Sequence, residues 1–220
     1  MSKILVVAEM LEGKVRKSTH SAITFARKAG QPFTILVLGA GAKTAAADVT
    51  AYGAEKVLAA EDASLKDYVG ERFAPTVAQV AKAGGFDVIV ATASSYGKDL
   101  MPRIAAKLGA GYAPDISDVK AEGGKLVYKR PMYAGNAYGL CEVTTPVQVV
   151  SARQSEFAAA EPSGGASPVE SVAVAPADAA AARVEFVSME SAKSERPDLG
   201  EARVIVSGGR ALKEQFAQVL

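Results

Sequence analysis

The sequence has 220 residues, 49% of them hydrophobic, and its 25 basic and 24 acidic residues leave a net charge of +1. This balance excludes the basic surface that binds nucleic acid or anionic membranes, so we expect neither partner. The single cysteine, Cys141, cannot form an internal disulfide, and neither a membrane-span pattern nor a signal or transit pattern is present. We therefore expect a soluble cytoplasmic protein without membrane insertion.

The first half of the chain alternates strand and helix patterns. Apolar runs typical of buried strands are found at residues 4–8, 33–38, 56–60 and 87–91. Helical patterns follow Ser18 and cover residues 44–52, 66–83 and 98–108. Pro102 must then lie in the first turn of the last helix, where its missing N–H costs little. This alternation predicts an α/β fold with a parallel sheet and helices on both faces.

The pattern changes after Gly109, where four strands are expected without helices between them. They cover residues 118–121, 126–133, 137–143 and 147–152. Strands joined without helices are usually antiparallel, so we expect them to be added to one edge of the parallel sheet. Together these elements form an N-terminal α/β domain over residues 1–153.

The rest of the chain divides into three parts. Residues 154–182 are rich in Ala, Pro, Ser and Gly, which predicts a mobile linker or a loosely packed excursion that buries little. Residues 183–188 are expected to form a strand that can return to the N-terminal domain. Residues 200–220 read as the start of a second domain: a strand over 203–206, the loop Ser207, Gly208, Gly209 and Arg210, and a helix over 211–220.

Hydrolytic or acid–base catalysis is not expected. The only histidine, His20, lies at the start of a predicted helix, where a surface or capping role is usual. A second histidine that could complete a metal site or serve as a general base is missing.

Two loops after predicted strands leave alternatives open. Residues 39–44 (GAGAKT), with Glu61 and Asp62 about twenty residues further on, imitate a dinucleotide-binding loop, but Thr44 replaces the third glycine. This loop either contacts a phosphate or simply makes a tight turn. Residues 94–99 (SSYGKD) either bind a ligand at the carboxyl edge of the sheet or cap a helix through Ser95 or Gly97.

Three segments in chain order resemble the alpha subunit of electron-transfer flavoprotein. They are SSYGKDLMPRIAAKLGAG, KRPMYAGNAYGLCEVTTPVQVVSARQSEF and RPDLGEARVIVSGGRALK. The resemblance implies a nucleotide-binding-like fold, related to the adenine nucleotide alpha hydrolases, for the N-terminal domain, which would serve as a scaffold without a nucleotide of its own. It also implies that residues 200–220 open an FAD domain, here truncated, in which Ser207, Gly208, Gly209 and Arg210 contact FAD.

A family member is an electron carrier, not an enzyme. The resemblance implies a heterodimer with a beta subunit that takes electrons from acyl-CoA dehydrogenases, as in fatty acid beta-oxidation, and passes them to a flavoprotein-quinone reductase. FAD would belong to the complete heterodimer and be absent from this chain alone. Two alternatives are a stand-alone adenine-nucleotide-binding module and a nicotinamide-dependent oxidoreductase that uses residues 39–44.

Overall fold

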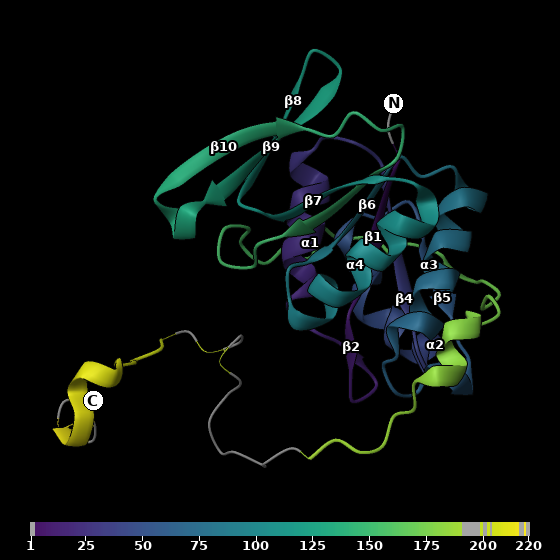
Figure 1. Cartoon of the computed structure of the whole chain (residues 1–220). Helices are drawn as coiled ribbons and strands as arrows, with labels where there is room; N and C mark the ends of the chain where they lie inside the picture. Colours follow the sequence, from purple (N-terminus) through teal and green to yellow (C-terminus); the bar gives the residue numbers. More distant parts are fainter. Residues whose placement is uncertain (1–2, 191–198, 200–201, 203, 216–217, 219–220) are drawn as a thin grey trace. The chain divides into compact units, whose positions relative to one another are not determined.

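The protein divides into two units, Met1–Val187 and Ser188–Leu220. The computed structural model describes residues 3–190, 199, 202, 204–215 and 218, and Figure 1 shows the whole chain. The helices of the first unit, including short 3-10 turns (η), are α1 (Thr19–Lys28), α2 (Ala42–Ala45), η1 (Ala46–Tyr52), η2 (Ala63–Leu65), α3 (Gly70–Gly84), α4 (Ser95–Leu108), η3 (Tyr133–Gly135) and η4 (Ala179–Arg183).

The core of the first unit is a seven-stranded sheet in the order β12-β5-β4-β1-β6-β11-β7. All six neighbouring pairs are parallel. The strands are β1 (Ile4–Val7), β4 (Phe33–Leu38), β5 (Val57–Ala60), β6 (Val88–Thr92), β7 (Gly111–Ile116), β11 (Gln148–Ala152) and β12 (Val169–Ser171). The predicted α/β class with a parallel sheet is thereby confirmed.

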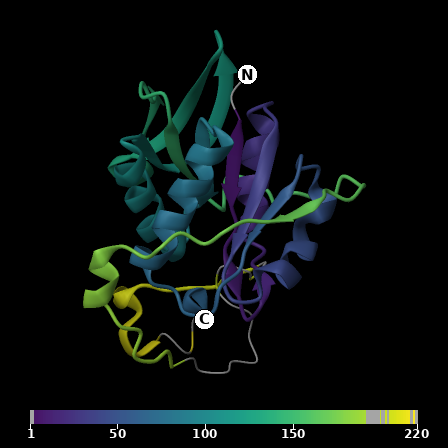
Figure 2. The same ribbon diagram turned by 90° about the vertical axis from the view of Figure 1, so that its right-hand side faces the viewer.

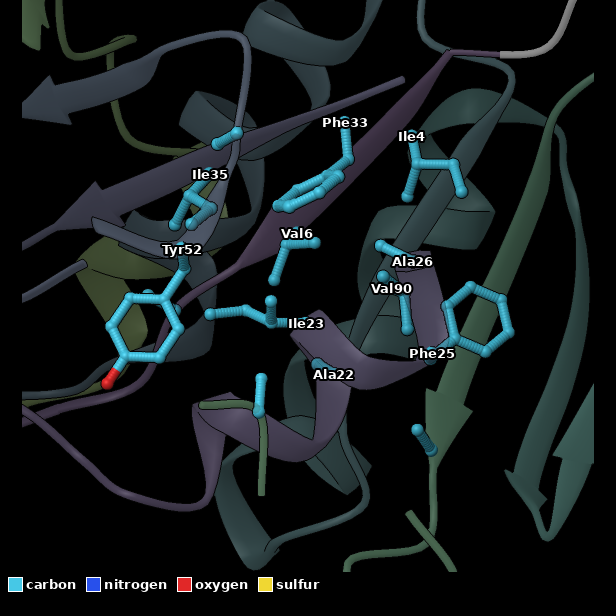
Figure 3. Packing of buried hydrophobic residues seen from close by; sticks show 14 of the residues in the cluster. Ile4, Val6, Ala22, Ile23, Phe25, Ala26, Phe33, Ile35, Tyr52 and Val90 are labelled. Carbon is cyan, nitrogen blue, oxygen red and sulfur yellow. The ribbon is translucent and has the colours of Figure 1, made fainter. Parts of the chain in front are cut away.

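Alternate side chains of each central strand pack against different helices. In β1, Ile4 and Val6 belong to one buried cluster with residues of α1 and η1, which Figure 3 shows from close by. Leu5 and Val7 belong to a second cluster with residues of α3 and α4. Both faces of the sheet are covered, which is why its strands read as continuous apolar runs.

Helix α4 differs from its prediction at its start. It begins at Ser95, three residues before the predicted residue 98, so Pro102 lies inside the helix and not in its first turn. The earlier start follows from Ser94, which caps the helix by accepting a hydrogen bond from the Gly97 N–H at 3.1 Å. One of the two alternatives for residues 94–99 was a helix cap through Ser95 or Gly97, and the capping residue is instead Ser94.

The strands after α4 form two arrangements. Strands β8 (Asp118–Glu122), β9 (Lys125–Met132) and β10 (Ala137–Glu142) make an antiparallel three-stranded sheet next to β7. The Ser117 N–H donates to the Lys129 carbonyl at 2.8 Å where the chain passes from β7 into β8. The added antiparallel strands are confirmed, but β11 is not one of them, because it is inserted between β6 and β7 and is parallel to both.

Strand β7 was not expected from the sequence. It contains Pro114, which cannot donate to a strand neighbour and therefore does not look like a strand residue. The edge position resolves this conflict, because β7 has only one neighbour in the main sheet, β11, and an edge strand tolerates a proline.

Residues 154–182 pack more closely than their composition predicted. The expectation that they bury little fails at Phe157, which is 2% exposed, and at Ala160, at 6%. The sequence missed β12, which adds a parallel strand beyond β5. The chain then crosses over α3, as Figure 2 shows, where the Ala175 N–H donates to Thr76 Oγ1 at 3.1 Å. Each of these contacts joins residues far apart in the sequence, so composition alone could not predict it.

The predicted strand at 183–188 is absent. Residues 179–183 form the turn η4, and residues 184–188 are neither helix nor strand, because no neighbouring strand pairs with them. In the second unit, Val204–Val206 are also exposed and unpaired, so the described part of the strand expected at 203–206 is not formed. Arg210–Gln215 is a 3-10 turn, η5, interrupted at Lys213, and residue 203 and most of 216–220 lie outside the described residues.

Candidate functional site

The candidate binding crevice lies beyond the carboxyl ends of β1 and β6. The chain proceeds from β1 to β4 on one side and later returns to β6 on the other side. In open parallel sheets this reversal of strand order leaves a crevice in which ligands bind. The side chains that follow β1 and β6 therefore decide what this domain can hold.

Glu9 occupies this crevice with a carboxylate from the chain itself. It follows β1 and is 8% exposed. Its carboxylate accepts hydrogen bonds from Ser94 Oγ at 2.7 Å and from Arg16 Nη1 at 3.2 Å. The Glu9 N–H donates to Thr19 Oγ1 at 3.1 Å, which ties the end of β1 to the start of α1. The position is thus occupied by a negative charge that already has its partners.

The N-terminus of α4, where a phosphate could otherwise bind, is also occupied. Ser94 Oγ accepts from the Gly97 N–H and donates to Glu9. A Cβ at Gly97 would overlap the Thr92 carbonyl, so the first turn of α4 is packed directly against the end of β6. Residues 94–99 therefore serve here as a helix cap, the second of the two alternatives. An added phosphate would meet the Glu9 carboxylate, and like charges repel.

The loop over residues 39–44 uses its own acidic residue in the same manner. The Lys43 N–H donates to Glu61 Oε2 at 2.9 Å, and Gly39 and Ala40 donate to the carbonyls of Ala60 and Leu65. Glu61 is one of the two acidic residues at the spacing where a single carboxylate would bind the ribose of a dinucleotide. The other, Asp62, accepts from the Ser64 N–H at 2.8 Å. This geometry is that of a tight turn and argues against the nicotinamide alternative.

A cluster of aromatic rings lines the cavity next to this crevice. The ring centroids of Tyr68 and Tyr96 are 4.8 Å apart, and those of Tyr68 and Phe73 are 5.1 Å apart. The cavity beside them has a volume of about 120 Å³, whereas ligand pockets usually measure about 300–1,000 Å³. Burial raises the pKa of Tyr96 well above its ordinary value, so the phenol stays neutral. An adenine nucleotide does not fit this cavity.

The hydroxyl of Tyr68 links the rings to the helices. It donates to Asp99 Oδ2 at 2.6 Å, and Arg103 of α4 pairs with both Asp99 and Glu71. Burial opposes the charge on Asp99, but the hydrogen bonds from Tyr68 and Arg103 hold its pKa below the ordinary value. The network fastens α3 to α4 and does not present a free charge to a ligand.

His20 lies outside the crevice network. Its ring stacks on Tyr52 with centroids 4.7 Å apart, and burial lowers its pKa. Among the residues that the structure describes, no group of three or more His, Cys, Asp or Glu side chains could hold a metal ion. The described helices also include none long and apolar enough to cross a membrane.

The predicted FAD contacts lie in the second unit. Ser207, Gly209 and Arg210 are exposed and Gly208 is half-buried. The Leu212 N–H donates to the Gly209 carbonyl at 3.1 Å, and a Cβ at Gly209 would meet no atom within 4 Å. Backbone N–H groups and a guanidinium in an open loop suit phosphate oxygens.

Sequence reasoning missed Glu9 and Arg16. A signal was present, because Glu9 follows the buried run of residues 4–8 directly and therefore falls at the ligand edge of the sheet. The partnership with Arg16 depends on the short hairpin of β2 (Met10–Leu11) and β3 (Lys14–Val15), which returns the chain to the end of β1.

Comparisons with known proteins agree on one family. The family described as "Electron transfer flavoprotein domain" matches residues 4–177. The chain is 39% identical over 214 residues to a probable electron transfer flavoprotein subunit alpha, mitochondrial, of Caenorhabditis elegans, covering 97% of this chain and 63% of that protein. It is 35% identical to the electron transfer flavoprotein subunit alpha of Pseudomonas aeruginosa, with 96% and 66% covered, and 40% identical to that of Bradyrhizobium diazoefficiens, with 98% and 67% covered. The chain thus spans about two thirds of the length of these relatives.

Proposed function

The chain belongs to the electron transfer flavoprotein family, and from this premise we propose that it acts in the alpha subunit of a heterodimeric electron carrier. The observation that supports this most directly is the crevice of the first unit, which the Glu9 carboxylate occupies next to the aromatic rings of Tyr68 and Tyr96. A domain that fills its own ligand crevice is suited to a scaffold, and the redox group is then held elsewhere. We propose a carrier without a substrate turnover of its own.

FAD is the proposed cofactor of the complete heterodimer. Ser207, Gly208, Gly209 and Arg210 would hold its phosphate groups, because the loop is open and Gly209 leaves room for close approach. Arg210 would pair its guanidinium with a phosphate oxygen or lie against the flavin. When bound, the flavin accepts and releases the electrons. Four residues cannot enclose a cofactor of this size, so further contacts must come from other parts of the heterodimer.

The proposed partners follow from the same role. They are the beta subunit, acyl-CoA dehydrogenases as electron donors and a membrane-bound flavoprotein-quinone reductase as acceptor. The proposed location is the bacterial cytoplasm. The near-neutral charge of the chain fits transient contacts with several proteins rather than binding to nucleic acid.

Flavin retention tests this function. The alpha subunit, expressed in its natural reading frame together with the beta subunit, is dialysed and its flavin absorbance measured before and after an acyl-CoA dehydrogenase and its substrate are added. We expect bound flavin that the dehydrogenase reduces. Arg210→Ala removes a charge-assisted contact worth about 1.5–3 kcal/mol, and flavin retention falls roughly tenfold or more.

Two variants serve as controls for this experiment. Arg210→Lys keeps the charge and should retain more flavin than Arg210→Ala. Arg183→Ala removes an exposed arginine of the first unit and should retain flavin like the wild type. Unchanged retention in Arg210→Ala contradicts the role of Arg210, and a complex whose flavin no dehydrogenase reduces contradicts the carrier function.

A further inference from the structure

Another cavity of the first unit lies at the amino edge of the main sheet, away from the crevice at the carboxyl edge. Its volume is about 420 Å³, whereas the cavity beside the crevice measures about 120 Å³. Ligand pockets usually measure about 300–1,000 Å³, so this cavity has the size of a binding site. Its apolar lining comes from β5, α3, the start of β6 and the segment after β12, namely Leu58, Val80, Phe86 and Val172.

The walls of this amino-edge cavity are fixed by the backbone. Gly84 is the last residue of α3, and a Cβ at this position would overlap the Phe86 ring. The Phe86 N–H donates to the Ala81 carbonyl at 3.0 Å, which holds the ring against the end of the helix. The segment after β12, which Figure 2 shows crossing α3, is held by the Val172 N–H donating to the Ala59 carbonyl at 3.0 Å. The cavity is therefore formed before any ligand enters.

A buried hydroxyl in this cavity has no partner within the described part of the chain. Thr34 lines the cavity and is only 2% exposed. It alternates with Phe33 and Ile35, which pack on the other face of the sheet, so its side chain lies on the face covered by α3. No hydrogen bond of the described residues involves Thr34 Oγ1. Buried polar groups are normally hydrogen-bonded, so this hydroxyl indicates a ligand with a polar group.

Two ammonium groups flank Thr34 at the mouth of the cavity. Lys3 lies two residues before Leu5, the register partner of Thr34 on β1. Lys56 lies on the other side of Thr34, directly before β5. Lys56 Nζ pairs with Glu170 Oε2 at 2.8 Å, whereas no ion pair among the described residues engages Lys3. The Lys3 ammonium is thus available to a negative group that lies next to Thr34.

The mouth of the cavity limits how much charge a ligand can carry. Glu55 also lines it, so two ammonium groups face two carboxylates and leave no excess charge. This balance suits a ligand with one negative charge and does not favour a nucleotide, which carries several. The Phe86 ring in the lining suits an aromatic body, because ring pairs stabilise each other beyond the area they bury.

We propose that the amino-edge cavity binds a small monocarboxylate with an aromatic body. The carboxylate accepts hydrogen bonds from the Lys3 ammonium and the Thr34 hydroxyl, and the ring packs against Leu58, Val80 and Phe86. The site goes beyond the carrier role and does not depend on it, because every residue that forms it belongs to the first unit.

Titration of the 220-residue chain with hydrocinnamate, a phenyl ring on a short carboxylate, tests the proposal. We expect a dissociation constant below about 1 mM. In amide correlation spectra the signals of residues 34, 58 and 84–86 should shift, and those of residues 94–99 at the crevice should not. Hydrocinnamyl alcohol has the same ring without the charge and should bind at least about fivefold more weakly.

Three substitutions separate the polar contacts from general effects. Thr34→Val removes the hydroxyl and keeps the shape, so binding should weaken about tenfold. The thermal midpoint of the free variant should equal or exceed that of the wild type, because no hydrogen bond within the protein is lost. Lys3→Gln should weaken binding at least about threefold. Lys14→Gln, at an exposed lysine of the β2–β3 hairpin, is the matched control and should bind within about twofold of the wild type.

A further pair of variants tests the location. Ala83 is an exposed residue of α3 that lines the cavity, and Ala83→Phe should abolish binding by filling the mouth. Ala106→Phe, at an exposed position of α4, should leave binding unchanged. Circular dichroism should match the wild type in both variants.

The other outcomes count against the proposal. Binding that persists in Ala83→Phe, or no binding by the wild type, overturns the site. Equal affinity for the acid and the alcohol overturns the carboxylate class. A lower thermal midpoint of Thr34→Val shows that the hydroxyl has a structural role and overturns its assignment as a ligand contact. Self-association of the chain that Ala83→Phe abolishes shows that a second copy fills the cavity, which also overturns the proposal.

Discussion

At the residue scale, Glu9 stabilises the crevice through its buried ion pair with Arg16. Its side chain is 11% exposed and that of Arg16 is 23%, so the pair is largely removed from water. Glu9→Gln removes the charge that pairs with Arg16 and accepts a hydrogen bond from Ser94, and we expect the free energy of unfolding to fall by about 1–3 kcal/mol in chemical denaturation. Glu12→Gln, at an exposed position on the adjacent hairpin, should change it by less than about 0.5 kcal/mol. Equal stabilities of the two variants would contradict the assigned role of Glu9.

A second residue-scale prediction concerns pH. Arg153 Nη2 lies 2.6 Å from Asp115 Oδ2, and the hydrogen bonds and charge of Arg153 lower the pKa of Asp115, which partial burial opposes. Lys98 and Arg130 lower it further. Because the folded pKa lies below the ordinary value of 3.8, the pair stabilises the protein above that value, and the contribution is lost as the pH falls through the lower folded pKa.

Asp115→Asn isolates this effect. Asn also tolerates the positive φ of 54° at this position. The pair is about one third exposed, so its loss should cost less than about 1 kcal/mol at neutral pH. Urea denaturation of both proteins between about pH 7 and pH 3 should show a difference that shrinks below about pH 4. A difference that stays constant over this range would rule out the ion pair as its source.

At the element scale, the segment after β11 is predicted to be part of the folded unit. Phe157 is 2% exposed and its ring lies 6.0 Å from that of Phe25. Phe157→Ala should therefore lower the free energy of unfolding by about 3–5 kcal/mol. Phe186→Ala is the matched control, because Phe186 is 40% exposed, and its effect should stay below about 1 kcal/mol. If both substitutions cost the same small amount, residues 154–160 do not belong to the core.

Local sequence patterns predicted the elements that bury apolar residues on both faces. β1, β4, β5 and β6 appeared as uninterrupted apolar runs because helices cover both sides of them. β7 and β12 were missed, because an edge strand with a proline and an exposed three-residue strand have no such pattern. The parallel pairing of β11 depends on where the chain returns after the projecting sheet, and no local pattern records that path.

The site was harder to predict than the fold for the same reason. Residues 39–44 and 94–99 were correctly placed after strands, yet their role depended on Glu61 and Glu9, which reach them from other segments. A motif identifies which amides could bind a phosphate. Only the folded structure shows that Glu61 and Glu9 already accept hydrogen bonds from these two loops.

At the scale of the whole molecule, the proposed scaffold and the proposed cofactor contacts belong to different units. The unit Met1–Val187 has two buried clusters on either side of one sheet and a crevice filled by its own side chains. The proposed flavin contacts, Ser207, Gly208, Gly209 and Arg210, belong to the other unit. We therefore expect the first unit to hold no nucleotide.

Flavin retention by the chain alone tests this claim most directly. The purified 220-residue chain is incubated with excess FAD, desalted and scanned across the visible flavin band. We expect a colourless protein, because the cavity of about 120 Å³ next to the crevice is too small and the loop at 207–210 binds FAD no more tightly than about millimolar. A yellow protein with near-stoichiometric flavin would contradict this expectation, because the 220 residues alone would then hold the cofactor.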